Sequence, residues 1–253
     1  MIKTINLDDN YKIKEYSLFS GEKLKTLESA HATQSITSCQ KNEIFDLIDP
    51  YIKLYDIIPN ISDNANSILV LGGGAFTYPK YFLSKYKNKT MDVVEINEIL
   101  YKASLEHFYL ADAINLFDPT QERFHVYICD AYDYIKQDRK YDAIFVDLYE
   151  DNEPLHKTFE KEVITQIKSL LTPGGYLFIN YIKSDANSEI LRDEMKIATQ
   201  EFTYAKIITN DLHYKANHGN ILIILSENNI ILPNGYDYKE IPLEIILSDN
   251  KTL

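Results

Sequence analysis

Short apolar runs alternate with amphipathic segments along most of the chain after residue 66. In the amphipathic segments, apolar residues recur at the three- and four-residue spacing of a helix. Wholly apolar strands separated by such helices are typical of a parallel sheet that is covered on both faces. The pattern predicts strands at residues 67–72, 90–96, 124–130, 141–148 and 175–182. The predicted helices that follow them lie at residues 78–86, 97–108, 131–138, 157–171 and 186–202.

Two further apolar runs, residues 205–211 and 220–227, close this part of the chain and have no helix between them. Strands without a crossover helix usually pair antiparallel, so we expect these two to lie side by side at one edge of the sheet. The predicted fold class is therefore α/β. It is a Rossmann-like, seven-stranded, mostly parallel sheet with an antiparallel last strand.

The beginning of the chain follows a different pattern. Residues 11–19 and 23–30 are short β-prone pieces separated by a Ser-Gly turn, which predicts a small antiparallel hairpin. Residues 43–58 carry apolar residues near helical spacing, and Pro50 interrupts them. We therefore expect a small β appendage, followed by a helical lead-in to the main sheet.

A polar connection at residues 61–67 marks the expected boundary between the two parts. The predicted organisation is a hairpin with its helical lead-in at residues 1–60 and a Rossmann-like domain at residues 61–253. A chain of 253 residues suits one large domain with a small appendage.

The charge balance narrows the classes of ligand. Lys and Arg total 26 and Asp and Glu total 38, which gives a formal net charge of −12. Phosphate backbones require positive surface, so nucleic acid is not an expected partner. A small neutral or cationic molecule is easier to accommodate. The six histidines are scattered without an HxxxH motif, so no metal site is expected.

The cellular setting is predicted from cysteines and hydropathy. Cys39 and Cys129 lie far apart without a CxxC motif, which fits a reducing cytoplasm. The first residues lack the apolar core of a signal peptide. No apolar run reaches the roughly 18 residues of a membrane span. We therefore expect a cytoplasmic protein without a membrane partner.

The first candidate chemistry lies where predicted strands end, because doubly wound sheets bind ligands there. Gly72-Gly73-Gly74 follows the first strand and would let a ligand approach the bare backbone closely. Glu95 ends the second strand, at the spacing of a carboxylate that grips ribose hydroxyls. The GxGxxG motif is incomplete because Thr77 stands at its last position. A plain turn and a solvated Glu are the alternatives without a ligand.

Two more strand ends carry carboxylates. Asp130 precedes Ala131 and could accept a hydrogen bond from an adenine amino group, or could simply cap the next helix. Asp147 begins an acidic stretch with Glu150 and Asp151 that could bind an amine or accept its proton, or could be a solvated loop.

Two tyrosines are expected near the same cleft. Tyr78 and Tyr149 could stack on a substrate or enclose a cationic sulfonium. Packing in the core or at the rim is the alternative for each. His156, just past the acidic stretch, could face the cleft or be an ordinary loop histidine.

Five segments in order, ILVLGGGAFTYPKYF, MDVVEIN, ICDAYDYI, YDAIFVDLYEDNEPLHKTF and LTPGGYLFINYI, resemble the spermidine synthase superfamily. The resemblance covers about residues 24–225 and implies a class I S-adenosylmethionine-type fold. It implies that Gly72 and Gly74 line the sulfonium end of the donor and that Glu95 holds its ribose. It further implies adenine contacts from Asp130 and Ala131, and a position for Asp147 at the mouth of the substrate cleft. Gln34 looks like the family's N-terminal Gln near the cofactor.

Several positions depart from the pattern of true aminopropyltransferases. Ala75 stands where the family has the acid that helps to hold the amine of decarboxylated S-adenosylmethionine. Glu150 replaces the second Asp of DxxDP, and no Pro follows it. The Tyr-His-Glu stretch is missing from residues 35–46. The pattern is closer to the family's uncharacterised, methyltransferase-like branch, which reads GGGxxTxPRY.

The leading prediction is a transferase that moves a methyl group from S-adenosylmethionine to a small, amine-bearing acceptor. Asp147, Glu150 and Asp151 are its expected catalytic residues. The first alternative is aminopropyl transfer from decarboxylated S-adenosylmethionine, and aminocarboxypropyl transfer is a further one. An inert adenosine-binding subunit and an NAD dehydrogenase are the remaining alternatives. The resemblance also allows a homodimer, because the family often dimerises or tetramerises.

Overall fold

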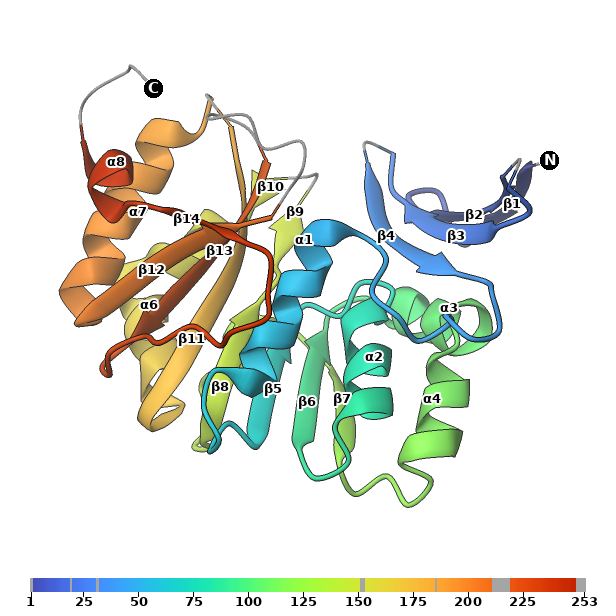
Figure 1. The fold of residues 1–253 in the computed structure, drawn as a ribbon, viewed down its shortest axis with the longest axis horizontal. Coiled ribbons are helices and arrows are strands. Elements are labelled where there is room, and N and C mark those ends of the chain that lie inside the picture. Colours follow the sequence, from blue (N-terminus) through green and yellow to red (C-terminus); the bar gives the residue numbers. More distant parts are fainter. Residues whose placement is uncertain are drawn as a thin grey trace.

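The computed structural model describes residues 2–18, 20–30, 32–150, 153–184, 186–210 and 219–248. It contains an α/β layer with a large central sheet and a separate antiparallel sheet formed by the first strands (Figure 1). The small sheet lies above α2 (Thr77–Lys85) and α3 (Glu98–His107) in this view. The predicted α/β class is confirmed.

The central sheet has the strand order β14-β12-β13-β11-β8-β5-β6-β7. Its strands are β5 (Ser67–Leu71), β6 (Thr90–Glu95), β7 (Phe124–Ile128), β8 (Tyr141–Val146), β11 (Leu171–Lys183), β12 (Tyr204–Thr209), β13 (Gly219–Ser226) and β14 (Lys239–Ile241). The first five pair in parallel, and β13 pairs antiparallel with both β11 and β12. The carboxyl ends of the parallel strands therefore meet along one edge of the sheet.

The pair β12 and β13 is antiparallel and lies toward one edge of the sheet, as expected. One detail differs from the prediction. An eighth strand, β14, extends the sheet beyond β12. Three residues with the sequence KEI carry too little periodicity to predict a strand.

Helices cover both faces of the central sheet, as the alternating pattern predicts. The first face packs against α1 (Pro50–Lys53), the 3-10 helix η1 (Leu54–Asn60), α2 and α4 (Leu110–Phe117). The second face packs against α5 (Ala131–Tyr134), η2 (His156–Phe159), α6 (Lys161–Ser169), α7 (Ser188–Glu201) and α8 (Leu243–Leu247). The structure thus buries two apolar layers, one on each side of the sheet.

The N-terminal sheet is larger than the predicted hairpin. Its order is β1-β2-β3-β4, with β1 (Ile2–Asn6), β2 (Lys12–Ser17), β3 (Lys23–Glu28) and β4 (Thr33–Ser38). The hairpin corresponds to β2 and β3. The outer two strands were missed because β1 is exposed along most of its length and β4 is rich in Ser and Thr. Neither strand therefore shows an apolar alternation.

The predicted helix at residues 43–58 is also shorter in the structure. Residues before Pro50 form turns, and Pro50 begins α1 instead of interrupting a helix. Proline suits the first helical position because the amide proton it lacks would have no intrahelical partner there. The chain then tightens into η1, whose buried residues pack on the sheet.

A buried lysine joins the N-terminal sheet to the α/β layer. Lys80 of α2 is fully buried, and its Nζ donates to Thr37 Oγ1 on β4 and to the Phe108 carbonyl oxygen at 3.2 Å. Burial lowers the pKa of Lys80 to about 7. The nearby Lys25 ammonium lowers it as well, while Cys39 and Asp46 oppose the shift. The fold therefore favours the neutral amine at this position.

Replacing Lys80 by Met should flatten the dependence of stability on pH. The folded-state pKa lies below the unfolded value, so the free energy of unfolding of the natural chain should rise as the pH increases above about 7. Chemical denaturation between pH 6 and pH 9 measures this slope. Lys102→Met, at an exposed position of α3, is the control and should keep the slope. An unchanged slope in Lys80→Met would contradict the assignment.

Candidate active site

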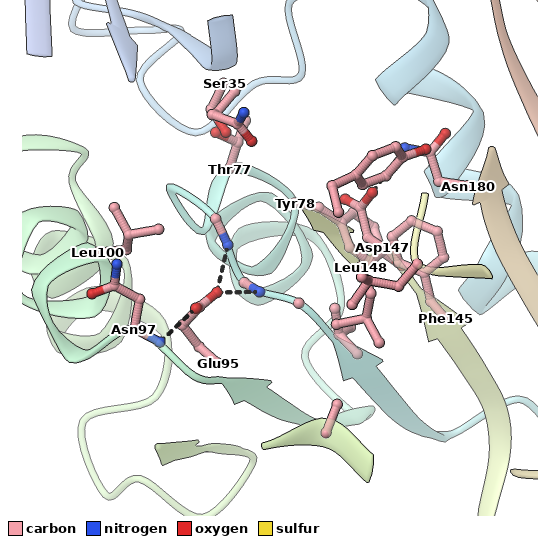
Figure 2. A pocket seen from close by; sticks show the side chains of 18 of the residues that line it. Ser35, Thr77, Tyr78, Glu95, Asn97, Leu100, Phe145, Asp147, Leu148 and Asn180 are labelled. Carbon is pink, nitrogen blue, oxygen red and sulfur yellow. Dashed lines mark hydrogen bonds between the residues drawn. The ribbon is translucent and has the colours of Figure 1, made fainter. Parts of the chain in front are cut away.

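The carboxyl ends of β5, β6, β7 and β8 open into a cavity of about 710 Å³ (Figure 2). The N-terminal sheet contributes β4 to its wall, and β11 closes the opposite side. Most of the residues predicted for the site line this cavity: Gln34, Gly72, Gly73, Gly74, Tyr78, Glu95, Asp130, Ala131, Asp147 and Tyr149. The fold therefore brings together residues from distant parts of the chain, as expected where the carboxyl ends of parallel strands meet.

Two of the predicted catalytic residues have no described side chain. Glu150 lies in β9 (Tyr149–Glu150), which pairs antiparallel with β10 (Glu153–Pro154). Asp151 lies outside the described residues. Within this acidic stretch, the structure therefore describes the side chains of Asp147 and Tyr149, which both line the cavity.

Gly72 is required by the fold itself. Its φ is +99°, and a Cβ at this position would lie 2.2 Å from the carbonyl oxygen of Asp147. Only glycine allows the end of β5 to pass so close to the end of β8. A Cβ at Gly74 would instead meet only Ser35 Oγ, at 3.6 Å, although its φ of +52° also favours glycine. In the glycine loop, Gly72 is needed for close packing of the backbone, whereas open space surrounds Gly74.

Glu95 ties this loop to the next strand. Its Oε2 accepts from the amides of Gly73 and Gly74 at 2.9 and 3.0 Å, and Oε1 accepts from the Asn97 amide at 2.8 Å (Figure 2). The residue is only 7% exposed, yet it lines the cavity. A carboxylate has about four acceptor positions, and three are used here, so Glu95 can still accept from one hydroxyl.

Asp130 caps the next helix, which is one of its two predicted roles, and the adenine contact stays a prediction. Its Oδ1 accepts from the Tyr132 amide at 2.6 Å, so it caps α5. It also lines the cavity beside Ala131.

Ile96 was not predicted, although it lines the same region and is 68% exposed. Its signal is an apolar residue directly after an acidic strand end, where it offers a flat apolar face to a ring.

Asp147 is the acidic group at the other end of the cavity. Its Oδ1 accepts from Asn180 Nδ2 at 2.8 Å. Burial raises the pKa of Asp147 to about 6, and the charge of Glu95 adds to this, while the Asn180 hydrogen bond opposes it. Asn180 was not predicted, although a lone Asn in the apolar run GYLFINYI was a usable signal.

Aromatic rings form the wall beside Asp147. The ring centroids of Tyr55 lie 4.5 Å from Phe145 and 5.7 Å from Tyr78, and all three residues line the cavity. Burial raises the pKa of Tyr55 and of Tyr149 above the usual range, and the charge of Asp147 contributes to both shifts. Burial raises the pKa of Tyr78 as well, but the charges that add to this shift come from Tyr86 and Asp56. Its hydroxyl therefore lies nearer to those residues than to Asp147. The ring of Tyr78 lines the cavity, so its stacking role stays a prediction, and Tyr55 was not predicted.

Ala75 faces away from the cavity. It is buried at 2% exposure among Ile13, Leu27, Leu100 and Phe108, between the N-terminal sheet and α3. An acid at this position would enter an apolar cluster. The missing acid at residue 75 therefore does not discriminate between donors in this structure.

Two other candidates take structural positions. His156 Nδ1 lies 2.7 Å from Glu194 Oε1 on α7, which matches the ordinary loop histidine. Cys129 lies at the cavity wall, and burial raises the pKa of its thiol, so it is not an activated nucleophile. Among the described residues, no group of His, Cys, Asp and Glu could hold a metal ion.

The charge of the cavity wall has one sign. Four carboxylates line it, from Asp49, Glu95, Asp130 and Asp147, and the described lining residues include no Lys, Arg or His. An electrically negative, partly enclosed site attracts cations and repels carboxylates. The arrangement can therefore bind a positively charged molecule and accept a proton from it.

Comparisons with known proteins agree with this geometry. The chain is 30% identical over 122 residues to the "Probable polyamine aminopropyl transferase" of Bifidobacterium longum, a match covering 48% of this chain and 25% of that protein. It is 25% identical over 185 residues to the "Polyamine aminopropyltransferase" of Oceanobacillus iheyensis, covering 72% of this chain and 34% of that protein. The chain thus spans only a quarter to a third of the length of these curated relatives.

Solved structures share the fold. A probable spermidine synthase from Corynebacterium glutamicum superposes with a TM-score of 0.72 at 18% identity, covering 93% of this chain and 83% of that one. Human methyltransferase-like protein 13 in complex with SAH gives a TM-score of 0.53 at 17% identity, covering 78% and 87%. The fold alone therefore does not separate the two reaction classes.

The sequence resemblance is confirmed by a match to a family model. The model of the spermine/spermidine synthase domain matches residues 54–230, which is more than half of the chain. The chain therefore belongs to the spermine/spermidine synthase family.

Proposed function

We propose that this chain is an aminopropyltransferase that uses decarboxylated S-adenosylmethionine and a primary amine. The observation that carries the proposal is the cavity wall, which has four carboxylates and, within the described ranges, no cationic side chain. The decarboxylated donor has a sulfonium and an ammonium but no carboxylate, so this wall suits it better than the intact donor. The names of the relatives support the same reaction.

The residues present fit the donor. Glu95 has acceptor capacity for one ribose hydroxyl, and the open side of Gly74 leaves room for the sulfonium end. Asp130 and Ala131 lie where a ring would meet the exposed face of Ile96. These residues would position the donor, which supplies a carbon already activated by the positive sulfur.

Asp147 would prepare the acceptor. A primary aliphatic amine is an ammonium at neutral pH, and it must lose a proton before its nitrogen lone pair can attack the carbon next to sulfur. Burial raises the pKa of Asp147 to about 6, which brings it closer to the pKa of an ammonium, so proton transfer between them becomes easier. The new carbon–nitrogen bond replaces the carbon–sulfur bond, whose electrons return to sulfur and leave neutral methylthioadenosine. The proton on Asp147 then passes to solvent.

Methyl transfer, the leading prediction from sequence, receives no support from the comparisons. Its main argument was the missing acid at Ala75, and that residue packs in the apolar cluster of the N-terminal sheet. The negative wall also opposes the carboxylate of intact S-adenosylmethionine. The first alternative from the sequence is therefore the proposed reaction.

Incubation with decarboxylated S-adenosylmethionine and a panel of aliphatic diamines should release methylthioadenosine, measured by chromatography. Asp147→Asn should reduce the rate at least about 100-fold, because general-base catalysis typically contributes that much. The natural enzyme should lose activity as the pH falls through about 6, since only ionised Asp147 accepts a proton. Release of S-adenosylhomocysteine from intact donor instead would establish methyl transfer. Binding of methylthioadenosine without turnover of either donor would favour the inert subunit.

The same variant should separate a catalytic defect from misfolding. The raised pKa of Asp147 means that its ionised form destabilises the fold above pH 6. Asp147→Asn should therefore melt at a higher temperature than the natural chain at pH 8, and this gain should shrink as the pH falls toward 4. A lower melting temperature at pH 8 would contradict the assigned burial cost.

Glu95→Gln should weaken binding of methylthioadenosine by roughly 10- to 100-fold in calorimetry, because hydrogen bonds to a charged group are stronger than those to an amide. The matched control is Glu98→Gln, an exposed residue three positions along on α3 that pairs with Lys102. It should bind with unchanged affinity. Equal affinity of Glu95→Gln and the natural chain would remove Glu95 from the ribose position.

A further inference from the structure

A chain of side-chain amides leads to Asp147 from two neighbouring strands. Asn220 Nδ2 on β13 donates to Asn180 Oδ1 at 3.1 Å. Asn180 Nδ2 on β11 donates to Asp147 Oδ1 at 2.8 Å. All three residues line the cavity, and Figure 2 shows Asn180 beside Asp147. The hydrogen bonds run in one direction, from β13 through β11 to the end of β8.

The sheet register explains how these residues meet. Ile179 on β11 pairs with Val146 on β8, so Asn180 and Asp147 are the next residues along the two parallel strands. Asn180 also pairs with Leu222 of β13, two residues from Asn220. The position of the amide chain is therefore fixed by the backbone ladder and does not depend on a loop.

A buried amide in this strand needs its partners. Asn180 is 7% exposed and follows the buried residues Leu177, Phe178 and Ile179. An unbonded amide there would cost more than an apolar side chain of similar size. Asn220 occupies the carbonyl oxygen of Asn180, which leaves the NH₂ group to face Asp147. The orientation of the amide is thus determined by its neighbour.

We propose that Asn180 is a positioning residue for the transfer reaction: it holds Asp147 Oδ1, so that Oδ2 is presented to the acceptor amine, and Asn220 fixes the orientation of Asn180. The inference rests on the proposed function, because it assigns a task to the carboxylate that accepts the proton. Asn180 acts through Asp147 and not on the donor.

Asn180 also sets the pH range of the carboxylate. The groups that face Asp147 are Glu95 from β6, Tyr55 from η1 and Tyr149 from β9, together with Asn180. Glu95 disfavours the ionised carboxylate, whereas the Asn180 hydrogen bond favours it. Removing the hydrogen bond should therefore raise the pKa of Asp147 further. The ionised base would then be available only at higher pH.

The test compares Asn180→Leu, which removes the donor at similar volume, with Asn180→Gln, which keeps an amide. In Asn180→Leu the acid limb of the kcat profile should move up by about one pH unit, and kcat at neutral pH should fall at least about tenfold. The affinity for methylthioadenosine should stay within about twofold, because Asn180 does not hold the donor. Asn180→Gln should recover part of kcat and of the pH profile.

The matched control is Ser226→Ala, which removes a buried hydrogen bond to Gly175 at the other end of β13. It should leave the pH profile in place, and it reports the effect of losing any polar contact within the sheet. Asn220→Leu should move the acid limb in the same direction as Asn180→Leu, by a smaller amount. An unmoved limb in a folded, donor-binding Asn180→Leu variant would overturn the positioning role.

Failure of the proposed function is a separate outcome. It would appear as the absence of methylthioadenosine release by the natural chain, before any variant is made. A natural chain that turns over, combined with an Asn180→Leu variant whose kcat and pH profile are unchanged, would refute only the role of Asn180. Circular dichroism and melting of both Asn180 variants establish that the compared proteins are folded.

Discussion

The close approach of Gly72 to the carbonyl of Asp147 is the contact on which the site depends. A Cβ at residue 72 would lie 2.2 Å from that oxygen, so no other residue fits without moving β5 away from β8. Two backbone bonds hold the same junction: the Gly72 amide donates to the Val94 carbonyl and the Asp147 amide to the Leu71 carbonyl, both at 2.8 Å. These contacts hold the ends of β5, β6 and β8 together, and they fix the position of Asp147.

Glu95 extends the same constraint to the glycine loop. Because its carboxylate accepts from the amides of Gly73 and Gly74, the loop is held by a charged partner of its own chain. A loop with free amides and a helix N-terminus would attract anions. With Glu95 in place, that attraction is largely neutralised, and the cavity keeps the negative character of its four carboxylates. The turn therefore lines a negatively charged cavity, although its glycines resemble those of phosphate-binding loops.

Much of this arrangement could be predicted from sequence because strand ends of a parallel sheet meet at one edge. Gly72, Glu95, Asp130 and Asp147 each follow an apolar run, so the pattern alone places them together. Asn180 lies within its strand, one pairing step beyond Ile179, and only the register of β11 against β8 shows that it meets Asp147.

The outer strands β1 and β4 were missed for a different reason. Their Ser, Thr and Lys side chains carry no apolar period, and these strands form through pairing with β2 and β3. At Ala75 the sequence suggested a feature that the structure does not show. Its place in the motif suggested a ligand contact, whereas the N-terminal sheet covers that side of the loop and buries the residue. The environment of Ala75 is thus set by packing against a distant segment of the chain, which a local motif cannot predict.

In the proposed reaction, the burial of Asp147 would let one carboxylate serve both binding and proton transfer. A fully solvated Asp has a pKa near 4 and would hold an ammonium firmly without taking its proton. In this cavity, aromatic walls from Tyr55 and Phe145 exclude water, and Glu95 adds negative charge, so the pKa moves to about 6. The Asn180 hydrogen bond limits that rise. Without it, a larger share of the carboxyl would be protonated near neutral pH, and that share could neither attract the amine nor accept its proton. The balance between desolvation and the Asn180 hydrogen bond therefore keeps the pKa of Asp147 at about 6, where the carboxylate is ionised at neutral pH but is a stronger base than a solvated Asp.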